Sequence, residues 1–208
     1  MYRMPFILFF GPDGSGKTTL ARYLYYILSR KYKVKIAWMR GTHTLASLLA
    51  RLLGLFNTFK GYDNPYYNIR IPSKLKRLWA GIEFISIIPI ILIKYIIPSR
   101  MGYLVIGERS YPDFITWLIM TLRNPKCIRY IGVKFLLSQA LKARHIVYIY
   151  ANLNELVRRR PYESRYISLE LAIYNVLFRY LDTFKIDTSN ETIHKSLKRI
   201  LEYTGLHV

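Results

Sequence analysis

Short apolar runs alternate with amphipathic stretches along the whole chain. The runs have the length and the β-branched and aromatic content of buried strands, and the amphipathic stretches repeat their apolar residues at helical spacing. We expect strands over residues 6–10, 34–38, 103–106, 146–150 and 185–187. We expect helices over residues 16–31, 42–53, 74–97, 112–123, 128–142, 154–160 and 166–184. This alternation predicts an α/β fold, with helices on both faces of a five-stranded parallel sheet.

Two local signals refine the expected helices. Thr188 and Glu191 have the spacing of a capping box, which predicts that a last helix begins there. Segment 74–97 contains the longest apolar run, Phe84–Ile93, and Pro89 inside it predicts a kink or a break. A membrane span needs roughly 18 or more apolar residues. We therefore expect a buried or dimer-facing helix, with interfacial membrane contact as the alternative.

Composition narrows the class of protein. The chain has 208 residues, and because 52% of them are hydrophobic, intrinsic disorder is excluded and one domain over residues 1–208 is expected. The single cysteine, Cys127, excludes an internal disulfide. With only four scattered histidines beside it, a Cys/His zinc cluster is excluded as well. The lone cysteine and an N-terminal apolar run too short for a signal peptide favour a cytoplasmic protein.

The chain is strongly basic, with 32 Lys and Arg against 12 Asp and Glu and a net charge of +20. Such a charge suits nucleic acid, an anionic membrane or small polyanionic substrates. The sequence has no run of five or more basic residues and no low-complexity segment. It therefore disfavours nucleic acid and membranes as partners, and small polyanionic substrates such as nucleotides are expected.

Gly11-Pro-Asp-Gly-Ser-Gly-Lys-Thr18 matches the phosphate-binding P-loop pattern G-x-x-x-x-G-K-[ST] in full, between an expected strand and an expected helix. Its glycines allow backbone N–H groups to point at phosphate oxygens, and the helix N-terminus adds favourable dipole charge. Lys17 would reach the β- and γ-phosphates, and the Thr18 hydroxyl would ligate Mg²⁺. The predicted ATP-binding residues are Gly11, Pro12, Asp13, Gly14, Ser15, Gly16, Lys17, Thr18 and Thr19. Because the GTPase base-reading pattern N-K-x-D is absent, a small-molecule kinase is favoured.

The order of the motifs resembles the thymidylate kinase family of nucleoside monophosphate kinases over nearly the whole chain. Gly11–Thr19 is close to that family's G-x-[DE]-G-x-G-K-T-T, and Glu108-Arg109-Ser110 is similar to its Asp-Arg-Tyr/His/Ser motif. Arg40-Gly-Thr lies where the family has Arg-Glu-Pro. The arginine-rich segment at about 155–168 resembles the family's lid. The resemblance implies the P-loop NTPase fold and phosphoryl transfer from MgATP.

The resemblance also implies roles for single residues. Lys17 and Arg109 would be catalytic, and Arg109 would bridge the donor and acceptor phosphates. The implied acceptor-binding residues are Asp13, Arg40, Trp79 and Arg109. The implied Mg²⁺ ligands are Thr18 and Glu108.

The lid would supply further catalytic charge. Gly14 stands where some family members carry a catalytic arginine in the loop, so the resemblance implies that a lid arginine replaces it. One helical turn cannot point Arg158, Arg159 and Arg160 all inward, and at least one of them should be solvent-exposed. Arg158 and Arg165 are the first choices for the catalytic arginine.

The acceptor stays open at this point. The family's base-reading helix and its Ser-x-x-Ala-Tyr-Gln segment have only loose counterparts here, at Arg77-Leu-Trp-Ala and Tyr111–Thr116. The resemblance implies phosphorylation of dTMP to dTDP, with another nucleotide or a nucleoside as the alternative acceptor. A basic nucleic-acid-binding ATPase is the alternative of another class. Because related kinases dimerise through helices, a homodimer is expected.

Overall fold

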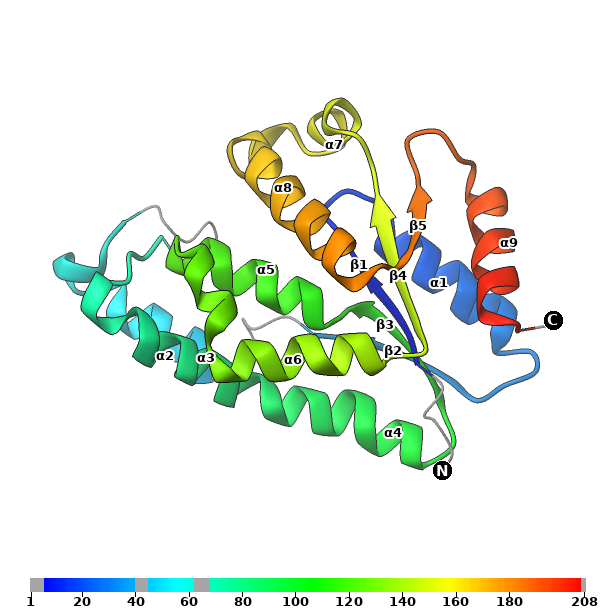
Figure 1. The fold of residues 1–208 in the computed structure, drawn as a ribbon, viewed down its shortest axis with the longest axis horizontal. Coiled ribbons are helices and arrows are strands. Elements are labelled where there is room, and N and C mark those ends of the chain that lie inside the picture. Colours follow the sequence, from blue (N-terminus) through cyan, green and yellow to red (C-terminus); the bar gives the residue numbers. More distant parts are fainter. Residues whose placement is uncertain (1–5, 40–44, 62–67, 207–208) are drawn as a thin grey trace.

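The structure is a computed structural model that describes residues 6–39, 45–61 and 68–206, and only the backbone of residues 163–165. Five parallel strands form one sheet in the order β2-β3-β1-β4-β5 (Figure 1). The strands are β1 (Phe6–Phe10), β2 (Val34–Trp38), β3 (Leu104–Arg109), β4 (His145–Tyr150) and β5 (Phe184–Asp187). The predicted five-stranded parallel sheet is thus confirmed, and β3 runs three residues further toward its carboxyl end than expected.

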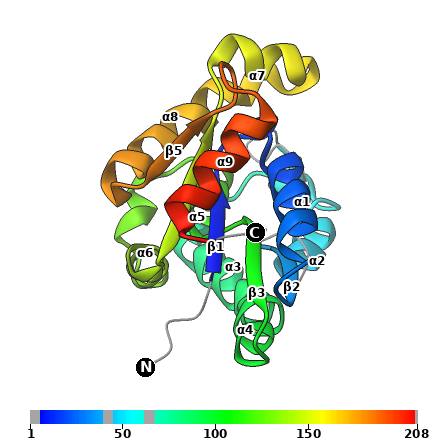
Figure 2. The same cartoon turned by 90° about the vertical axis from the view of Figure 1, so that its right-hand side faces the viewer.

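Helices cover both faces of the sheet (Figures 1 and 2). One face carries α1 (Lys17–Leu28) and α9 (Ile193–Thr204). The other face carries α2 (Leu45–Leu53), α3 (Lys76–Ile91), α5 (Tyr111–Leu122), α6 (Ile131–Lys142) and α8 (Ser164–Leu181). The short helix α7 (Leu153–Arg159) follows β4. Single turns complete the set: η1 (Asn57–Phe59), η2 (Ser73–Leu75), η4 (Pro125–Arg129) and η5 (Pro161–Glu163).

Each face of the sheet has its own hydrophobic core, and the alternation of side chains along β1 explains why. Side chains of a strand point to opposite faces in turn. Ile7 and Phe9 therefore pack with α1 and α9, whereas Leu8 and Phe10 pack with the helices on the other face. All four side chains are buried, as expected for a central parallel strand.

The expected start of the last helix is wrong, and the expected break at Pro89 is not found. The last helix begins at Ile193, and Thr192, not Thr188, accepts the capping hydrogen bond from the Lys195 N–H (3.3 Å). The Thr188 hydroxyl instead donates to the Ser15 carbonyl (2.9 Å), so the competing tertiary contact fixes the position of Thr188.

The helix after residue 73 neither breaks nor ends at Pro89. It continues through a π-turn, η3 (Leu92–Ile96), into α4 (Ile97–Arg100). The π-turn directly follows the proline and absorbs the distortion that a proline causes in a helix. A single helical body of 28 residues, Ser73–Arg100, results.

The chain order places a crevice above the carboxyl ends of the strands. The chain passes from β1 outward to β2, returns to β3 beside β1, and then crosses to β4 on the other side of β1. Ligands of open α/β sheets bind at such a switch point, outside the carboxyl ends. The segments that leave β1, β3 and β4 meet here, and they carry the predicted site residues other than Arg40 and Trp79.

Candidate functional site

The glycine-rich loop, residues 11–18, joins β1 to α1 at this edge of the sheet. Gly11 has a φ of 147°, and a Cβ atom there would lie 2.0 Å from the Ile149 carbonyl oxygen of β4. Gly14 also has a positive φ (86°), and a Cβ atom there would press on the Arg160 side chain, whose Cγ lies 3.2 Å away. Only glycine fits these two positions without strain, which explains the motif physically.

Lys17 points back into the loop and is only 4% exposed. Its Nζ donates to the carbonyls of Gly11 (2.5 Å) and Pro12 (2.7 Å). Burial, followed by the charge of Arg109, lowers the pKa of Lys17 from 10.5 to about 8. An ammonium group held this way loses little by exchanging the two carbonyls for phosphate oxygens, which carry full charge.

Thr18 and Glu108 supply two oxygen atoms side by side. The Thr18 hydroxyl donates to the Glu108 carboxylate, which stands at the end of β3. Hydroxyl and carboxylate oxygens suit Mg²⁺, which keeps several waters and takes few protein ligands. The described residues hold no group of three His, Cys, Asp or Glu that fits a metal ion. A cation at this pair would therefore complete its shell with water and phosphate oxygens.

Arg109 follows Glu108 and turns toward the loop. Its guanidinium donates to the Asp13 carboxylate and lies 3.9 Å from the Asp113 carboxylate. Burial alone would lower the pKa of Arg109, but Asp13 and then Asp113 reverse this and hold the pKa above its usual range. The carbonyl of Arg109 also accepts a hydrogen bond from the Tyr95 hydroxyl (2.5 Å). The end of β3 is therefore fixed at both side chain and backbone.

Asp113 is a site residue that the sequence analysis missed. Its carboxylate accepts from the Ser110 N–H (2.8 Å) and the Tyr174 hydroxyl (2.8 Å), and the Gly11 N–H lies 3.4 Å away. Burial raises the pKa of Asp113. The sequence does contain a signal for this residue: Ser110-x-x-Asp113 has the spacing of a capping box directly after the Glu108-Arg109 pair.

Glu170 of α8 was also missed, and no sequence motif marks it. It faces the same cluster, where burial and the Asp13 charge raise the pKa of Glu170 to about 7, and the Lys17 and Arg109 charges act in the opposite direction. Glu170, Arg109, Asp113 and Tyr174 line one small cavity under the site. Only the packing of α8 against the loop reveals this carboxylate.

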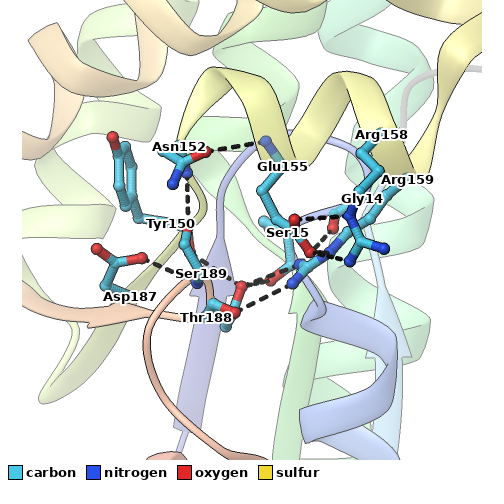
Figure 3. Close-up of polar contacts among 10 residues, drawn as sticks. All are labelled: Gly14, Ser15, Tyr150, Asn152, Glu155, Arg158, Arg159, Asp187, Thr188 and Ser189. Atoms are coloured by element: carbon cyan, nitrogen blue, oxygen red, sulfur yellow. Dashed lines mark hydrogen bonds and ion pairs between the residues drawn. The ribbon is translucent and has the colours of Figure 1, made fainter.

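The three consecutive arginines after β4 point in different directions. Arg158 is 75% exposed and pairs with Glu155 (2.6 Å). Arg159 donates to the Gly14 carbonyl and to the Thr188 carbonyl, both at 3.0 Å (Figure 3). The expectation that at least one of the three is solvent-exposed is confirmed.

Arg160 belongs to the site more closely than Arg158 does. Its guanidinium lies 3.2 Å from Oδ2 of Asp13, whereas the guanidinium of Arg109 contacts Oδ1 of the same carboxylate. Arg158, one of the two first choices for a catalytic arginine, is largely exposed and pairs with Glu155 in this structure. The side chain of Arg165, the other choice, lies outside the described residues.

A cavity of about 290 Å³ opens beside the loop. It lies between the start of α1 and the connection from β5 to α9, and its lining includes Thr19, Arg159, Thr188 and Glu191. A planar guanidinium on its wall can stack on a flat ring, and Glu191 adds a hydrogen-bond acceptor. The cavity thus has the chemistry to hold the base of a nucleotide whose phosphates lie on the loop.

The expected acceptor residues divide into two groups. Asp13 and Arg109 lie together at the loop. Trp79 lies on the buried side of α3 and is only 3% exposed. Its indole N–H donates to Glu83 (3.1 Å), so the ring offers no face for stacking here. Arg40 lies outside the described residues.

Comparison with known proteins finds no matching family model and no matching curated sequence.

Proposed function

We propose that this chain has a P-loop NTPase fold and is an ATP-dependent phosphotransferase, a nucleoside monophosphate kinase with MgATP as donor and dTMP as the first-choice acceptor. One observation carries the proposal. Consecutive residues at the end of β3, Glu108 and Arg109, contact two residues of the glycine-rich loop, Thr18 and Asp13. This brings a cation-binding oxygen pair and a phosphate-binding guanidinium to one place.

The donor side is the better defined half. Loop N–H groups, the start of α1 and Lys17 would bind the β- and γ-phosphates. The cavity lined by Arg159 and Glu191 would hold the base of ATP. Thr18 and Glu108 would hold Mg²⁺, which when bound neutralises charge on the β- and γ-phosphate oxygens.

The acceptor side rests on Arg109. Its guanidinium stands where a parallel strand ends, beside the loop, and a bidentate group there suits an acceptor phosphate. Asp13 and Asp113 orient Arg109 while no substrate is present. An acceptor that carries its own phosphate would compete with Asp13 for this guanidinium, which favours a monophosphate over a nucleoside.

The chain's residues act mainly by positioning and by charge. An oxygen of the acceptor phosphate attacks the γ-phosphorus, its new P–O bond forms, and the bond from that phosphorus to the β–γ bridging oxygen breaks to release ADP. Lys17, Arg109 and Arg160 place positive charge around the equatorial oxygens during this exchange. Arg159 and Arg160 already reach the loop, so the segment after β4 helps to exclude water.

An ADP-release assay over a panel of nucleoside monophosphates and nucleosides tests the proposal. We expect turnover that requires both Mg²⁺ and a monophosphate, with dTMP the best acceptor. If another compound of the panel is the best acceptor, the reaction class stands and that compound replaces dTMP as the acceptor. ATP turnover stimulated by DNA or RNA, and by no monophosphate, would overturn the kinase and support a nucleic-acid-dependent ATPase.

A further inference from the structure

The helical body Ser73–Arg100 is far more apolar than its place in the fold requires. Its most apolar window has a mean hydropathy of 2.1, and only 33% of that window is buried. Among the described residues it is the one helix long and apolar enough to cross a membrane, judged by length and composition alone. The ten-residue apolar run 84–93 is too short for a membrane span. The helix is much longer than this run because it continues past Pro89.

The inner side of this helix is tied to the domain. The Trp117 indole of α5 donates to Glu83 (3.4 Å), the Ser86 hydroxyl accepts from the Ala46 N–H (3.0 Å), and the Tyr95 hydroxyl donates to the Arg109 carbonyl (2.5 Å). These contacts run from the middle of α3 into the π-turn. The helix therefore lies along the body of the protein, and any membrane contact it makes is with its outer side.

The outer side is a continuous apolar stripe. Exposed residues follow at intervals of three and four, and the neighbouring helix α6 adds two more. Ile85 is 60% exposed, Ile93 is 61% exposed and Ile131 is 85% exposed. This apolar face consists of Leu78, Ile85, Ile88, Leu92, Ile93, Ile97, Met101, Ile131 and Phe135. Contiguous exposed apolar surface of this kind marks an interaction site.

A groove runs along the apolar face between α3 and α6. It holds about 500 Å³ and is lined by apolar side chains and Gly132. A smaller cavity of about 240 Å³ shares Phe84, Ile131 and Gly132 with this groove, and Arg77 and Arg129 stand on its wall. An apolar channel that leads to guanidinium groups has the chemistry of a site for an amphiphile with an anionic head.

The charges around the apolar face have one sign. Between residues 68 and 154, where the structure describes the chain without a gap, the only acids are Glu83, Glu108 and Asp113. Glu83 lies on the buried side of α3, and Glu108 and Asp113 belong to the loop site. The same stretch has thirteen Lys and Arg, among them Lys74, Lys76, Arg77, Lys94, Arg100, Arg129 and Lys134.

We propose that the apolar face docks on an anionic membrane surface, with its Ile and Leu side chains and groove against the acyl chains and its basic rim against the lipid headgroups. Apolar burial and attraction to anionic lipid act together in such binding. A second copy of the chain docked on the same face fits less well, because each copy would bring the same bases and, within the described stretch 68–154 that forms this face, no exposed acid to pair with them. The proposal is independent of the kinase reaction.

Sedimentation with vesicles of phosphatidylcholine and phosphatidylglycerol, without nucleotide, tests this. We expect the full chain to pellet with these vesicles at about 0.1 M salt, to do so less at about 0.5 M salt because screening shortens the reach of the charges, and to stay in solution with phosphatidylcholine alone. Ile85→Asn/Ile93→Asn should weaken partitioning by about tenfold or more. The matched control is Val176→Asn/Tyr180→Asn on α8, because these side chains are equally exposed (62% and 58%).

A set of charge-removing variants distinguishes a lipid surface from a second copy of the chain as the partner of the apolar face. Arg100→Gln/Arg129→Gln/Lys134→Gln should weaken pelleting, whereas Arg22→Gln/Lys33→Gln/Lys195→Gln, on the other side of the sheet, should have less effect. Circular dichroism and melting confirm that every variant folds. Equal pelleting of wild type and Ile85→Asn/Ile93→Asn would overturn the proposal. It would also be overturned by a chain that ignores anionic vesicles and forms a dimer, in light scattering, that this double variant dissociates.

Discussion

At the carboxyl edge of the sheet, acidic and basic side chains are buried in mutual contact, whereas on the apolar face exposed bases surround an uncharged surface. Asp13 there meets Arg109 and Arg160, and Thr18 meets Glu108. Within the described stretch 68–154, the only acid near the apolar face is Glu83, which two tryptophan N–H groups hold inside the core. The same excess of positive charge is thus arranged in two ways within one chain.

The difference shows what each region is suited to hold. Paired, buried charges are fixed before a ligand arrives, so a phosphate finds its partners preorganised and only displaces carbonyls and carboxylates. Exposed bases beside apolar side chains suit a broad, diffuse partner such as a lipid surface. Variants at the two regions should therefore affect different measurements, and each prediction below tests that separation.

The largest effect is expected from Lys17→Ala. It removes the charge proposed to meet the β- and γ-phosphates, and kcat/KM for ATP should fall by at least about 100-fold, about 2.7 kcal/mol in the barrier. The fold should persist, because a lysine whose pKa is lowered by burial contributes little stability in its charged form. Lys195→Ala on α9 is the exposed control and should change nothing. If Lys17→Ala turns over at the wild-type rate, the glycine-rich loop is not the donor site.

The next largest effects are expected at the arginines after β4, and the three variants should differ in which kinetic parameter changes. Arg160→Ala should lower kcat by about tenfold, because Arg160 lies at Asp13 where the phosphoryl group would pass. Arg159→Ala should instead raise KM for ATP, because Arg159 lines the base cavity. Arg158→Ala, which loses only an exposed pair with Glu155, should stay within about twofold.

Two outcomes would change this assignment. If Arg158→Ala has the largest effect, the segment after β4 rotates when substrates bind, and the sequence-based choice of Arg158 regains its place. If the quadruple variant at Arg158, Arg159, Arg160 and Arg165 keeps kcat within about a factor of two, Lys17 and Arg109 carry the charge alone.

The sequence predicted the regions that depend on local pattern. Periodicity located all five strands, and the glycine motif located the loop, because backbone geometry there admits little other than glycine. It did not predict contacts made across the fold. Glu170 enters the site from α8, Trp79 is buried although a stacking role was expected, and Thr188 leaves its expected cap to bind Ser15. Each of these depends on how helices pack, which no local spacing encodes.

The pH dependence of the loop site should reflect Lys17. In the free protein the pKa of Lys17 is about 8, so above this pH the ammonium loses its proton and would no longer attract phosphate. We expect kcat/KM for ATP to fall by up to about tenfold per pH unit above pH 8. Lys17→Arg, with a guanidinium that stays charged, should lower the absolute value and remove this falling limb. A falling limb that persists in Lys17→Arg would belong to another group.

The smallest effect concerns the acid beneath the apolar face, and it is measured as stability. Burial raises the pKa of Glu83 from 4.5 to about 8, with Trp117 and Trp79 opposing this by hydrogen bonds. The folded state therefore retains a proton that the unfolded chain releases above pH 4.5. Stability from this group is fully present below pH 4.5, and it is lost progressively as the pH rises to about 8.

Glu83→Gln removes the titration while keeping an acceptor for the two indole N–H groups. At pH 8 the variant should be more stable than the wild type by about 1 kcal/mol or more, or about 2–4 °C in Tm, and the difference should shrink at pH 5. Thermal melts between pH 5 and pH 8 measure this, with kcat as a second readout. Because Glu83 lies under the apolar face and not at the loop, kcat should stay unchanged. A melting difference that is constant across this pH range would mean that Glu83 is ionised in the folded protein, and an altered kcat would mean that the two regions are coupled through α3.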